Sequence, residues 1–200
     1  MHVVCLDLEG VLVPEIWIEF AKATGINELK ITTRDEPDYD KLMKYRIDIL
    51  DRNGLKLNDI QKVIGGMDPL PGAKAFTDTL RSITQLIILS DTFLQFAQPL
   101  MAKLAFPTLF CNSLIVSDNG CIKGYTLRQS EGKRKAVEAL RNINLTVFAA
   151  GDSYNDLGMI REAHAGALFC APDMIKKQNP TTPAFETYDD LLNNIKQFLA

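Results

Sequence analysis

The sequence lacks the features that would place it in or across a membrane. No apolar run approaches the roughly 20 residues that a membrane-spanning helix needs, and the first residues do not have the pattern of a signal peptide. We therefore expect a cytoplasmic protein with no membrane partner. The four cysteines, Cys5, Cys111, Cys121 and Cys170, are scattered without C-x-x-C spacing, which favours reduced structural thiols over metal ligation or disulfides.

A large excess of charge of one sign is also missing. The chain of 200 residues has a formal net charge of −3, and its basic residues are dispersed apart from the short cluster 133–135. Proteins that bind nucleic acid usually present a concentrated basic surface, so we expect small-molecule substrates and no nucleic-acid partner. A chain of this length can bury one sizeable core, or one core with a small inserted lobe. Monomer and homodimer both remain open.

The sequence does contain an alternation of apolar strands and helices, and this alternation is interrupted once. A buried strand at 3–6 is followed, from about residue 14 to residue 69, by helical patterns alone. Strands and helices then alternate to the end of the chain. We predict an α/β fold with a doubly wound, mostly parallel Rossmann-like sheet, formed by residues 1–13 and 70–200. Residues 14–69 are expected to form a small helical cap.

The expected elements follow from apolar spacing and from glycine and proline positions. In the insertion, we expect helices at 14–24, 39–52 and 58–64 and a polar loop at 32–38. Later helices are expected at 73–82, 93–104, 133–141, 172–177 and 188–199, and strands at 86–89, 108–111, 114–117, 121–127, 146–150 and 165–169. Asp118-Asn119-Gly120 predicts a hairpin, which would be the one antiparallel element.

Three of the apolar strands end in oxygen-bearing side chains. These are Asp7 with Glu9, Ser90 with Asp91, and Asp152 with Asp156. Because the carboxyl ends of parallel strands meet at one edge of a sheet, residues about 145 positions apart can come together. Clustered carboxylates would repel one another without a divalent cation, and oxygen ligands favour Mg²⁺ over zinc. Lys133, at the start of a helix, could balance the remaining charge.

The first of these strand ends has a chemical and a structural interpretation. Asp7 could attack phosphorus, and Glu9, two residues on, could carry protons for the leaving group. A strand that ends in a solvated acidic turn would have the same local sequence. The coincidence of three such strand ends with a lysine favours the chemical interpretation.

One charged residue stands out in the insertion. Met43, Ile47 and Leu50 share a helical stripe, and Arg46 falls within it. Its guanidinium must extend to solvent, pair with an acid or bind an anionic ligand. Glu15 is expected in the first turn of a helix, where its negative charge could interact favourably with the helix dipole or contact a ligand.

Four segments resemble the signatures of the haloacid dehalogenase superfamily, and of its phosphoserine phosphatases in particular. They are Asp7-Leu8-Glu9-Gly10-Val11, Leu89-Ser90-Asp91, Lys133, and Gly151-Asp152-Ser153-Tyr154-Asn155-Asp156. The resemblance covers essentially the whole chain, because the insertion is similar to the small cap of phosphoserine phosphatases. The stretch from Asp7 to Glu15 also resembles bacterial members that combine phosphoserine phosphatase with homoserine phosphotransferase activity.

The resemblance implies a role for each motif residue. Asp7 would be the nucleophile that forms an aspartyl-phosphate, and Glu9 would be the general acid and base. Lys133 would offset charge on Asp7 and on the transferring group. The Mg²⁺ ligands would be Asp7, the backbone carbonyl of Glu9, and Asp152, with Asp156 as a further ligand or as support for one. The substrate would be bound by Glu15, Met43, Arg46, Ser90, Asp91, Lys133 and Asn155, with Arg46 on the carboxylate and Glu15 on the ammonium group.

The chain departs from the family pattern at three places. Glu9 replaces the usual aspartate and is longer by one methylene, Val11 replaces a residue that often carries a hydroxyl, and Asp91-Thr92 stands where glycines are common. A repositioned base could favour an alcohol over water as the acceptor. We therefore expect a Mg²⁺-dependent phosphoserine phosphatase that also transfers the phosphoryl group to homoserine. The alternatives are a phosphatase of another small phosphomonoester, or a phospho-accepting signalling or binding module without turnover.

Overall fold

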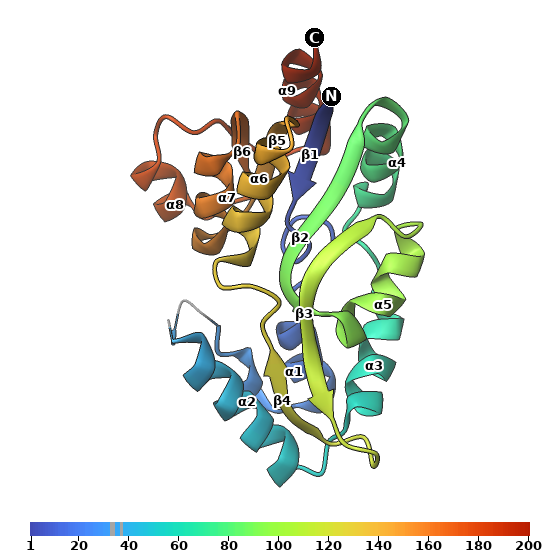
Figure 1. Ribbon diagram of the computed structural model, residues 1–200. Coiled ribbons are helices and arrows are strands. Elements are labelled where there is room, and N and C mark those ends of the chain that lie inside the picture. The colour runs from blue at the N-terminus through green and yellow to red at the C-terminus, as the bar shows by residue number, and fades with distance from the viewer. Residues whose placement is uncertain (33–34, 37) are drawn as a thin grey trace.

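The computed structural model describes residues 1–32, 35–36 and 38–200, which form a sheet of seven strands with helices on both faces (Figure 1). The order is β4-β3-β2-β1-β5-β6-β7, and neighbouring strands are parallel except β3 and β4. The strands are β1 (His2–Leu6), β2 (Gln85–Phe93), β3 (Thr108–Val116), β4 (Ile122–Thr126), β5 (Thr146–Gly151), β6 (Ala165–Phe169) and β7 (Ala184–Phe185). The predicted fold class is confirmed.

The helices agree closely with the sequence pattern. They are α1 (Ile16–Thr24), α2 (Tyr39–Arg52), α3 (Leu57–Gly66), α4 (Ala73–Ile83), α5 (Leu94–Lys103), α6 (Gly132–Asn142), α7 (Leu157–Glu162), α8 (Asp173–Gln178) and α9 (Tyr188–Leu199), with 3₁₀ turns η1 (Asn27–Lys30) and η2 (Tyr154–Asp156). The sequence does not predict α7, β7, η1 or η2, each of which has six residues or fewer. Residues 33, 34 and 37 of the expected loop lie outside the described residues.

Strand β1 lies at the centre of the sheet and separates two apolar layers. Val4 and Leu6 face the layer that includes α4 and α9, whereas Val3 and Cys5 face the layer that includes α6 and α7. This alternation is the two-residue period of a strand buried on both faces. The chain proceeds from β1 to β2 on one side and later to β5 on the other. The carboxyl end of β1 is therefore the point at which open α/β sheets bind ligands.

The insertion between β1 and α4 contains α1, η1, α2 and α3, as the helical pattern predicts. Its apolar residues, such as Leu29, Met43 and Ile60, belong to the same core cluster as Leu6 and Phe76 of the main body. Strand β4 lies beside α2, so this end of the molecule is not made of helices alone (Figure 1). None of the described helices combines the length and apolarity that a membrane span requires.

Two strands expected at 108–111 and 114–117 form the single strand β3, which corrects the prediction. The polar residue Asn112 indicates a break, yet its side chain is buried and satisfied within the strand. Its Nδ2 donates to the carbonyl of Asp91 at 3.1 Å, and its Oδ1 accepts from the N–H of Arg128 at 3.0 Å. The hairpin between β3 and β4 is confirmed, with Gly120 at φ 83° in the turn.

Strand β2 is longer than expected, and it continues through Ser90 to Phe93 with a register irregularity against β3. Helix α5 therefore begins at Leu94, one residue later than predicted, and contains Pro99. Proline cannot donate to the carbonyl of Gln95 four residues before it. Gln61 of α3 supplies that hydrogen bond from its Nε2 at 2.9 Å. The contact also ties the insertion to the main body.

Candidate active site

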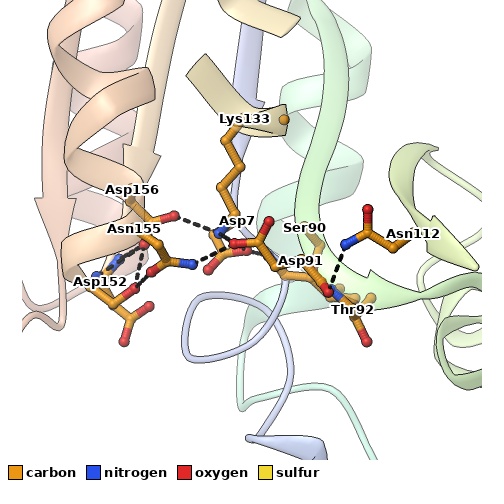
Figure 2. Close-up of polar contacts among 12 residues, drawn as sticks. Asp7, Ser90, Asp91, Thr92, Asn112, Lys133, Asp152, Asn155 and Asp156 are labelled. Carbon is orange, nitrogen blue, oxygen red and sulfur yellow. Dashed lines mark hydrogen bonds and ion pairs between the residues drawn. The ribbon is translucent and has the colours of Figure 1, made fainter. Parts of the chain in front are cut away.

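The polar ends of β1 and β5 meet around Lys133, as the strand pattern predicts (Figure 2). The Nζ of Lys133 lies 2.9 Å from Oδ1 of Asp7 and 2.7 Å from Oδ1 of Asp156. It is 3.8 Å from Oδ2 of Asp91, near the end of β2. Residues from three strand ends and from the first turn of α6 thus form one charged cluster.

Burial makes the charges of this cluster interdependent. Asp7 and Lys133 are each 5% exposed, and Asp156 is fully buried. Loss of solvation, followed by repulsion from Asp156, raises the pKa of Asp7, and the nearby ammonium of Lys133 opposes this rise. Burial alone would lower the pKa of Lys133, but attraction to Asp156, Asp7 and Asp91 outweighs it and raises that pKa. Lys133 therefore carries a positive charge at neutral pH.

Asp156 fixes the turn that follows β5. Its Oδ2 accepts from the N–H groups of Asp152 at 3.1 Å and Ser153 at 3.0 Å, and from the Oγ of Ser153 at 2.9 Å. A Cβ at Gly151 would lie 2.2 Å from Cγ of Asp156, so this close approach requires glycine. The other oxygen of Asp156, Oδ1, contacts Lys133. Both oxygens of Asp156 are therefore bonded to the protein, and the residue holds Asp152 and the turn in place.

Three carboxylates of the cluster could hold a metal ion. Asp7, Asp152 and Asp156 each offer an oxygen within 4.8 Å of the others. Gly10, at φ 78°, turns the chain so closely past Asp152 that a Cβ there would meet its carboxylate at 2.7 Å. A buried set of oxygen ligands with surplus negative charge fits a hard divalent cation such as Mg²⁺. The structure therefore confirms that the three acids lie close together, as the sequence predicts.

The end of β2 contributes groups suited to hold a phosphoryl group. Ser90 is 7% exposed, and its Oγ accepts from the N–H of Thr92 at 3.2 Å. The carbonyl of Asp91 accepts from the Oη of Tyr39 at 3.2 Å and from Asn112. The Oδ2 of Asp91 accepts from Nδ2 of Asn155 at 2.8 Å (Figure 2). Both the backbone carbonyl and the side chain of Asp91 are thus hydrogen-bonded within the protein.

A cavity of about 180 Å³ connects this cluster with the insertion. Its lining includes Asp7, Ser90 and Lys133 at one end and Glu9, Glu15 and Arg46 at the other. The structure thus brings these residues, which the sequence singles out, together around one cavity. Trp17, Thr32 and Tyr39 also line the cavity, and nothing in the sequence distinguishes them from core or surface residues.

Arg46 is buried in the cavity and does not extend to solvent. It is 6% exposed, its Nη2 donates to the carbonyl of Ile31 at 2.7 Å, and its guanidinium carbon lies 4.6 Å from the centre of the Trp17 ring. Within the part of the chain that the structure describes, its buried Nε has no hydrogen-bond partner. Burial lowers the pKa of Arg46 to about 10, and Glu9 opposes the shift, so the side chain remains a cation.

Glu9 is placed at the beginning of α1. Its Oε2 accepts from the N–H of Ile16 at 2.8 Å, so it satisfies one free donor of that helix end. Burial, followed by repulsion from Glu15, raises the pKa of Glu9 to about 7. A carboxyl with a pKa near neutrality can both donate and accept a proton in one catalytic cycle. The environment of Glu9 thus suits a general acid and base.

Two residues of the insertion differ from the sequence-based prediction. Helix α1 begins at Ile16, so Glu15 lies at the residue before the helix and not in its first turn. Met43 is fully buried in the core cluster and is absent from the lining of the cavity. Core packing therefore accounts for Met43, because the apolar stripe of α2 turns it away from the polar hollow and toward the other helices.

Comparison with known proteins shows the family of the chain. Residues 1–164 match the model of the haloacid dehalogenase-like hydrolases. The chain belongs to this hydrolase family. It is 57% identical over 191 residues to a phosphoserine phosphatase named ThrH from Pseudomonas aeruginosa. The matched region covers 96% of this chain and 93% of that protein. It is 54% identical to a phosphoserine phosphatase from Pseudomonas syringae pv. tomato, over 96% of this chain and 81% of that protein.

Solved structures of phosphoserine phosphatases share the fold of the chain. A phosphoserine phosphatase described as a phospho-aspartyl intermediate analogue has a TM-score of 0.79 at 20% identity, and covers 96% of this chain and 98% of its own. A substrate-bound phosphoserine phosphatase has a TM-score of 0.78 at 21% identity, over 100% of this chain and 98% of its own. At these identities the agreement is one of fold alone.

Proposed function

We propose that this protein is a phosphoserine phosphatase that works through a phosphoryl group on Asp7. The observation that carries the proposal is the buried guanidinium of Arg46, whose Nε lacks a partner among the described residues, in the same cavity as Asp7 and Lys133. A cation in the same cavity as a phosphoryl site suits a substrate with a second anionic group. The names of the relatives from Pseudomonas support phosphoserine as that substrate.

The residues around Asp7 have the properties that phosphoryl transfer requires. A carboxylate oxygen of Asp7 attacks phosphorus, while the ammonium of Lys133 and the groups at Ser90 hold the equatorial oxygens. The N–H of Leu8 and Lys133 both bond to Oδ1 of Asp7 at 2.7 and 2.9 Å, and leave Oδ2 without a donor among the described residues. Oδ2 is therefore the better candidate nucleophile.

A divalent cation completes the proposed site. Asp7, the backbone carbonyl of Glu9, and Asp152 would hold Mg²⁺, and Asp156 would keep Asp152 and its turn in position. The ion would supply positive charge between the nucleophile and the phosphoryl oxygens, where like charges otherwise oppose each other. Lys133 alone cannot neutralise several neighbouring acids.

The other end of the cavity is the proposed site for the amino-acid part of the substrate. The Nε of Arg46 would donate to the substrate carboxylate, and Glu15 would accept from the ammonium group. Asn155, which at present donates to Asp91, would be a further polar contact. We also propose that residues 14–69 act as a cap domain that determines the substrate, with residues 1–13 and 70–200 as the catalytic body.

Glu9 would serve both halves of the reaction. Protonated Glu9 gives its proton to the oxygen of the leaving serine, and the resulting carboxylate then accepts a proton from the incoming acceptor. We propose that this acceptor can be the hydroxyl of homoserine as well as water. The longer arm of glutamate and its pKa of about 7 support this proposal.

The proposal is tested with phosphoserine and Mg²⁺, in the presence and absence of homoserine, by identifying every phosphorylated product. We expect serine and phosphate without homoserine, and additional phosphohomoserine with it. Free phosphate alone would remove the transfer reaction and leave the phosphatase. Turnover of other small phosphomonoesters without preference for phosphoserine would favour the alternative substrate class, and no turnover of any of them would favour a binding module.

A further inference from the structure

A second hollow adjoins the catalytic cavity on the side of Lys133. This groove of about 570 Å³ extends from Tyr39 past the segment before α6 to the turn between β5 and α7. It is roomier than the catalytic cavity of about 180 Å³. The two hollows share five lining residues, which are Tyr39, Asp91, Lys133, Ser153 and Asn155. These five residues therefore form the layer along which the two hollows adjoin.

The separating layer contains a pair of side chains that can move without any change in the backbone. Nδ2 of Asn155 donates to Oδ2 of Asp91 at 2.8 Å, and both side chains are partly or largely exposed. The carbonyl of Asp91 is held by Tyr39 at 3.2 Å and by Asn112 at 3.1 Å. Rotation of the two side chains would open the layer, and it would break their own hydrogen bond, the 3.8 Å ion pair of Asp91 with Lys133 and the contact of Asn155 with Ser153.

The contacts that hold the insertion against the main body lie beside the same layer. Tyr39 is bonded to Asp91, its ring packs edge-on against Tyr125 at 5.6 Å, and the hydroxyl of Tyr125 is hydrogen-bonded to Asp40. These contacts link the first turn of α2 to β2 and β4. A product that leaves through the groove would not require them to break.

The polar groups of the groove suit a small oxyanion. Lys133 lies between the two hollows, and Asn112, Gln129 and Arg134 continue along the groove. The negative charge of Glu131 is paired with Arg134 at 3.1 Å, so it adds little repulsion. A phosphate ion that leaves Lys133 in this direction meets the exposed amide of Gln129. Asn112 already donates to the carbonyl of Asp91, and Arg134 already donates to Glu131 and Glu138, so the charges beyond Gln129 are paired.

We propose that this groove is the exit for inorganic phosphate, and that the pair of Asp91 and Asn155 is its gate. The inference rests on the proposed phosphatase function, but it depends only on phosphate as a product. It therefore applies to any small phosphomonoester that the cavity accepts. The insertion can then stay in contact with the main body while phosphate leaves.

Gln129→Phe tests the exit, because Gln129 is exposed and lines the groove but not the catalytic cavity. The variant should slow phosphate release about tenfold, as a blocked product route does when release limits turnover. Release is followed with a phosphate sensor in solution, and serine formation in the first turnover is measured by rapid quench. The serine burst and the equilibrium inhibition by phosphate should be unchanged, since a plug slows entry and exit equally.

Two variants serve as controls. Lys44→Phe adds the same ring to a different groove, between α2 and β4, which shares no lining residue with the catalytic cavity. Gln129→Ala removes bulk at the tested position. Both should release phosphate at the wild-type rate, and melting temperatures should show that all three variants are folded.

Two results would overturn the exit. One is phosphate release by Gln129→Phe at the wild-type rate, and the other is a slower serine burst with a higher KM for the donor, which would make the groove an entrance. Failure of the proposed substrate looks different, because the wild-type protein would then not turn over phosphoserine at all. The same release measurements can in that case be made with p-nitrophenyl phosphate.

Discussion

The two ends of the catalytic cavity differ in how their charges are satisfied. At the Asp7 end, Lys133 contacts Asp7 and Asp156, and Asp156 accepts three further hydrogen bonds. At the Arg46 end, one buried N–H of the guanidinium has no partner among the described residues, and Glu9 and Glu15 repel each other. The first end is organised before any substrate arrives. At the second end, the substrate would supply the missing partners. Selectivity between substrates should therefore depend on the Arg46 end.

Loss of Lys133 should give the largest effect, because the ammonium neutralises buried acids. Lys133→Met should abolish turnover and lower the free energy of unfolding by about 3–5 kcal/mol, the usual result of removing one partner from a buried ion pair. Urea unfolding with EDTA present measures this. The control is Lys176→Met, since Lys176 pairs with Glu186 at the surface and should contribute about 0–1 kcal/mol. Equal losses in the two variants would contradict the account.

The close approach of Gly10 to Asp152 gives the next effect. Gly10→Ala should raise the Mg²⁺ concentration needed for half-maximal activity about 10- to 100-fold, as changes next to metal ligands do. Gly54→Ala is the matched control, because Gly54 also has a positive φ but nothing within 4 Å of the added Cβ. In both variants the alanine must adopt a left-handed backbone conformation, which lowers the free energy of unfolding by about 1–2 kcal/mol. A normal Mg²⁺ requirement in Gly10→Ala would separate Asp152 from the metal.

Arg46 should affect selectivity more than chemistry. Arg46→Ala should lower kcat/KM for phosphoserine about 10- to 150-fold, which corresponds to a loss of about 1.5–3 kcal/mol, the range for hydrogen bonds to charged groups. Phosphoethanolamine lacks the carboxylate, so the variant and the wild type should use it at similar rates. Arg52→Ala, on the exposed side of the same helix, is the control. Equal losses with the two substrates would remove Arg46 from carboxylate recognition.

The smallest expected effect is the pH dependence of Glu9. Its pKa is raised from 4.5 to about 7, so the protonated fraction persists to neutral pH and falls as the pH rises through 7. Release of serine in the first turnover should slow over that range, by about tenfold for each pH unit above the pKa. With p-nitrophenyl phosphate, whose leaving group needs no proton, the first step should be flat. A flat profile with phosphoserine as well would remove Glu9 as the proton donor.

The fold and the charged end of the site follow largely from the sequence. Apolar strands that end in Asp7 and Asp152 require a parallel sheet whose edge brings them together, and the structure has that sheet. The boundaries of α2, α9 and β6 match the prediction because their apolar spacing and end signals agree. Local pattern and global fold point to the same arrangement at these places.

The sequence reveals less where a polar group is satisfied by a distant partner. Asn112 indicates a break in a strand, but Asp91 and Arg128 complete its hydrogen bonds and the strand continues. Tyr39 has no local signal at all, because its role depends on the carbonyl of Asp91, 52 residues away. Met43 lies on the same helix as Arg46, and periodicity cannot tell which of the two faces the cavity. Such contacts depend on tertiary geometry, which composition and spacing do not encode.

The most direct test of the account is whether phosphate becomes attached to Asp7. Phosphoserine labelled in its phosphoryl group is mixed with the enzyme and Mg²⁺, the reaction is quenched with acid, and label on the polypeptide is counted and mapped. We expect transient label, at most one phosphate per chain, on the peptide that contains Asp7, and none in Asp7→Asn. Wild-type turnover by Asp7→Asn, or a wild-type protein that turns over without ever carrying label, would contradict it.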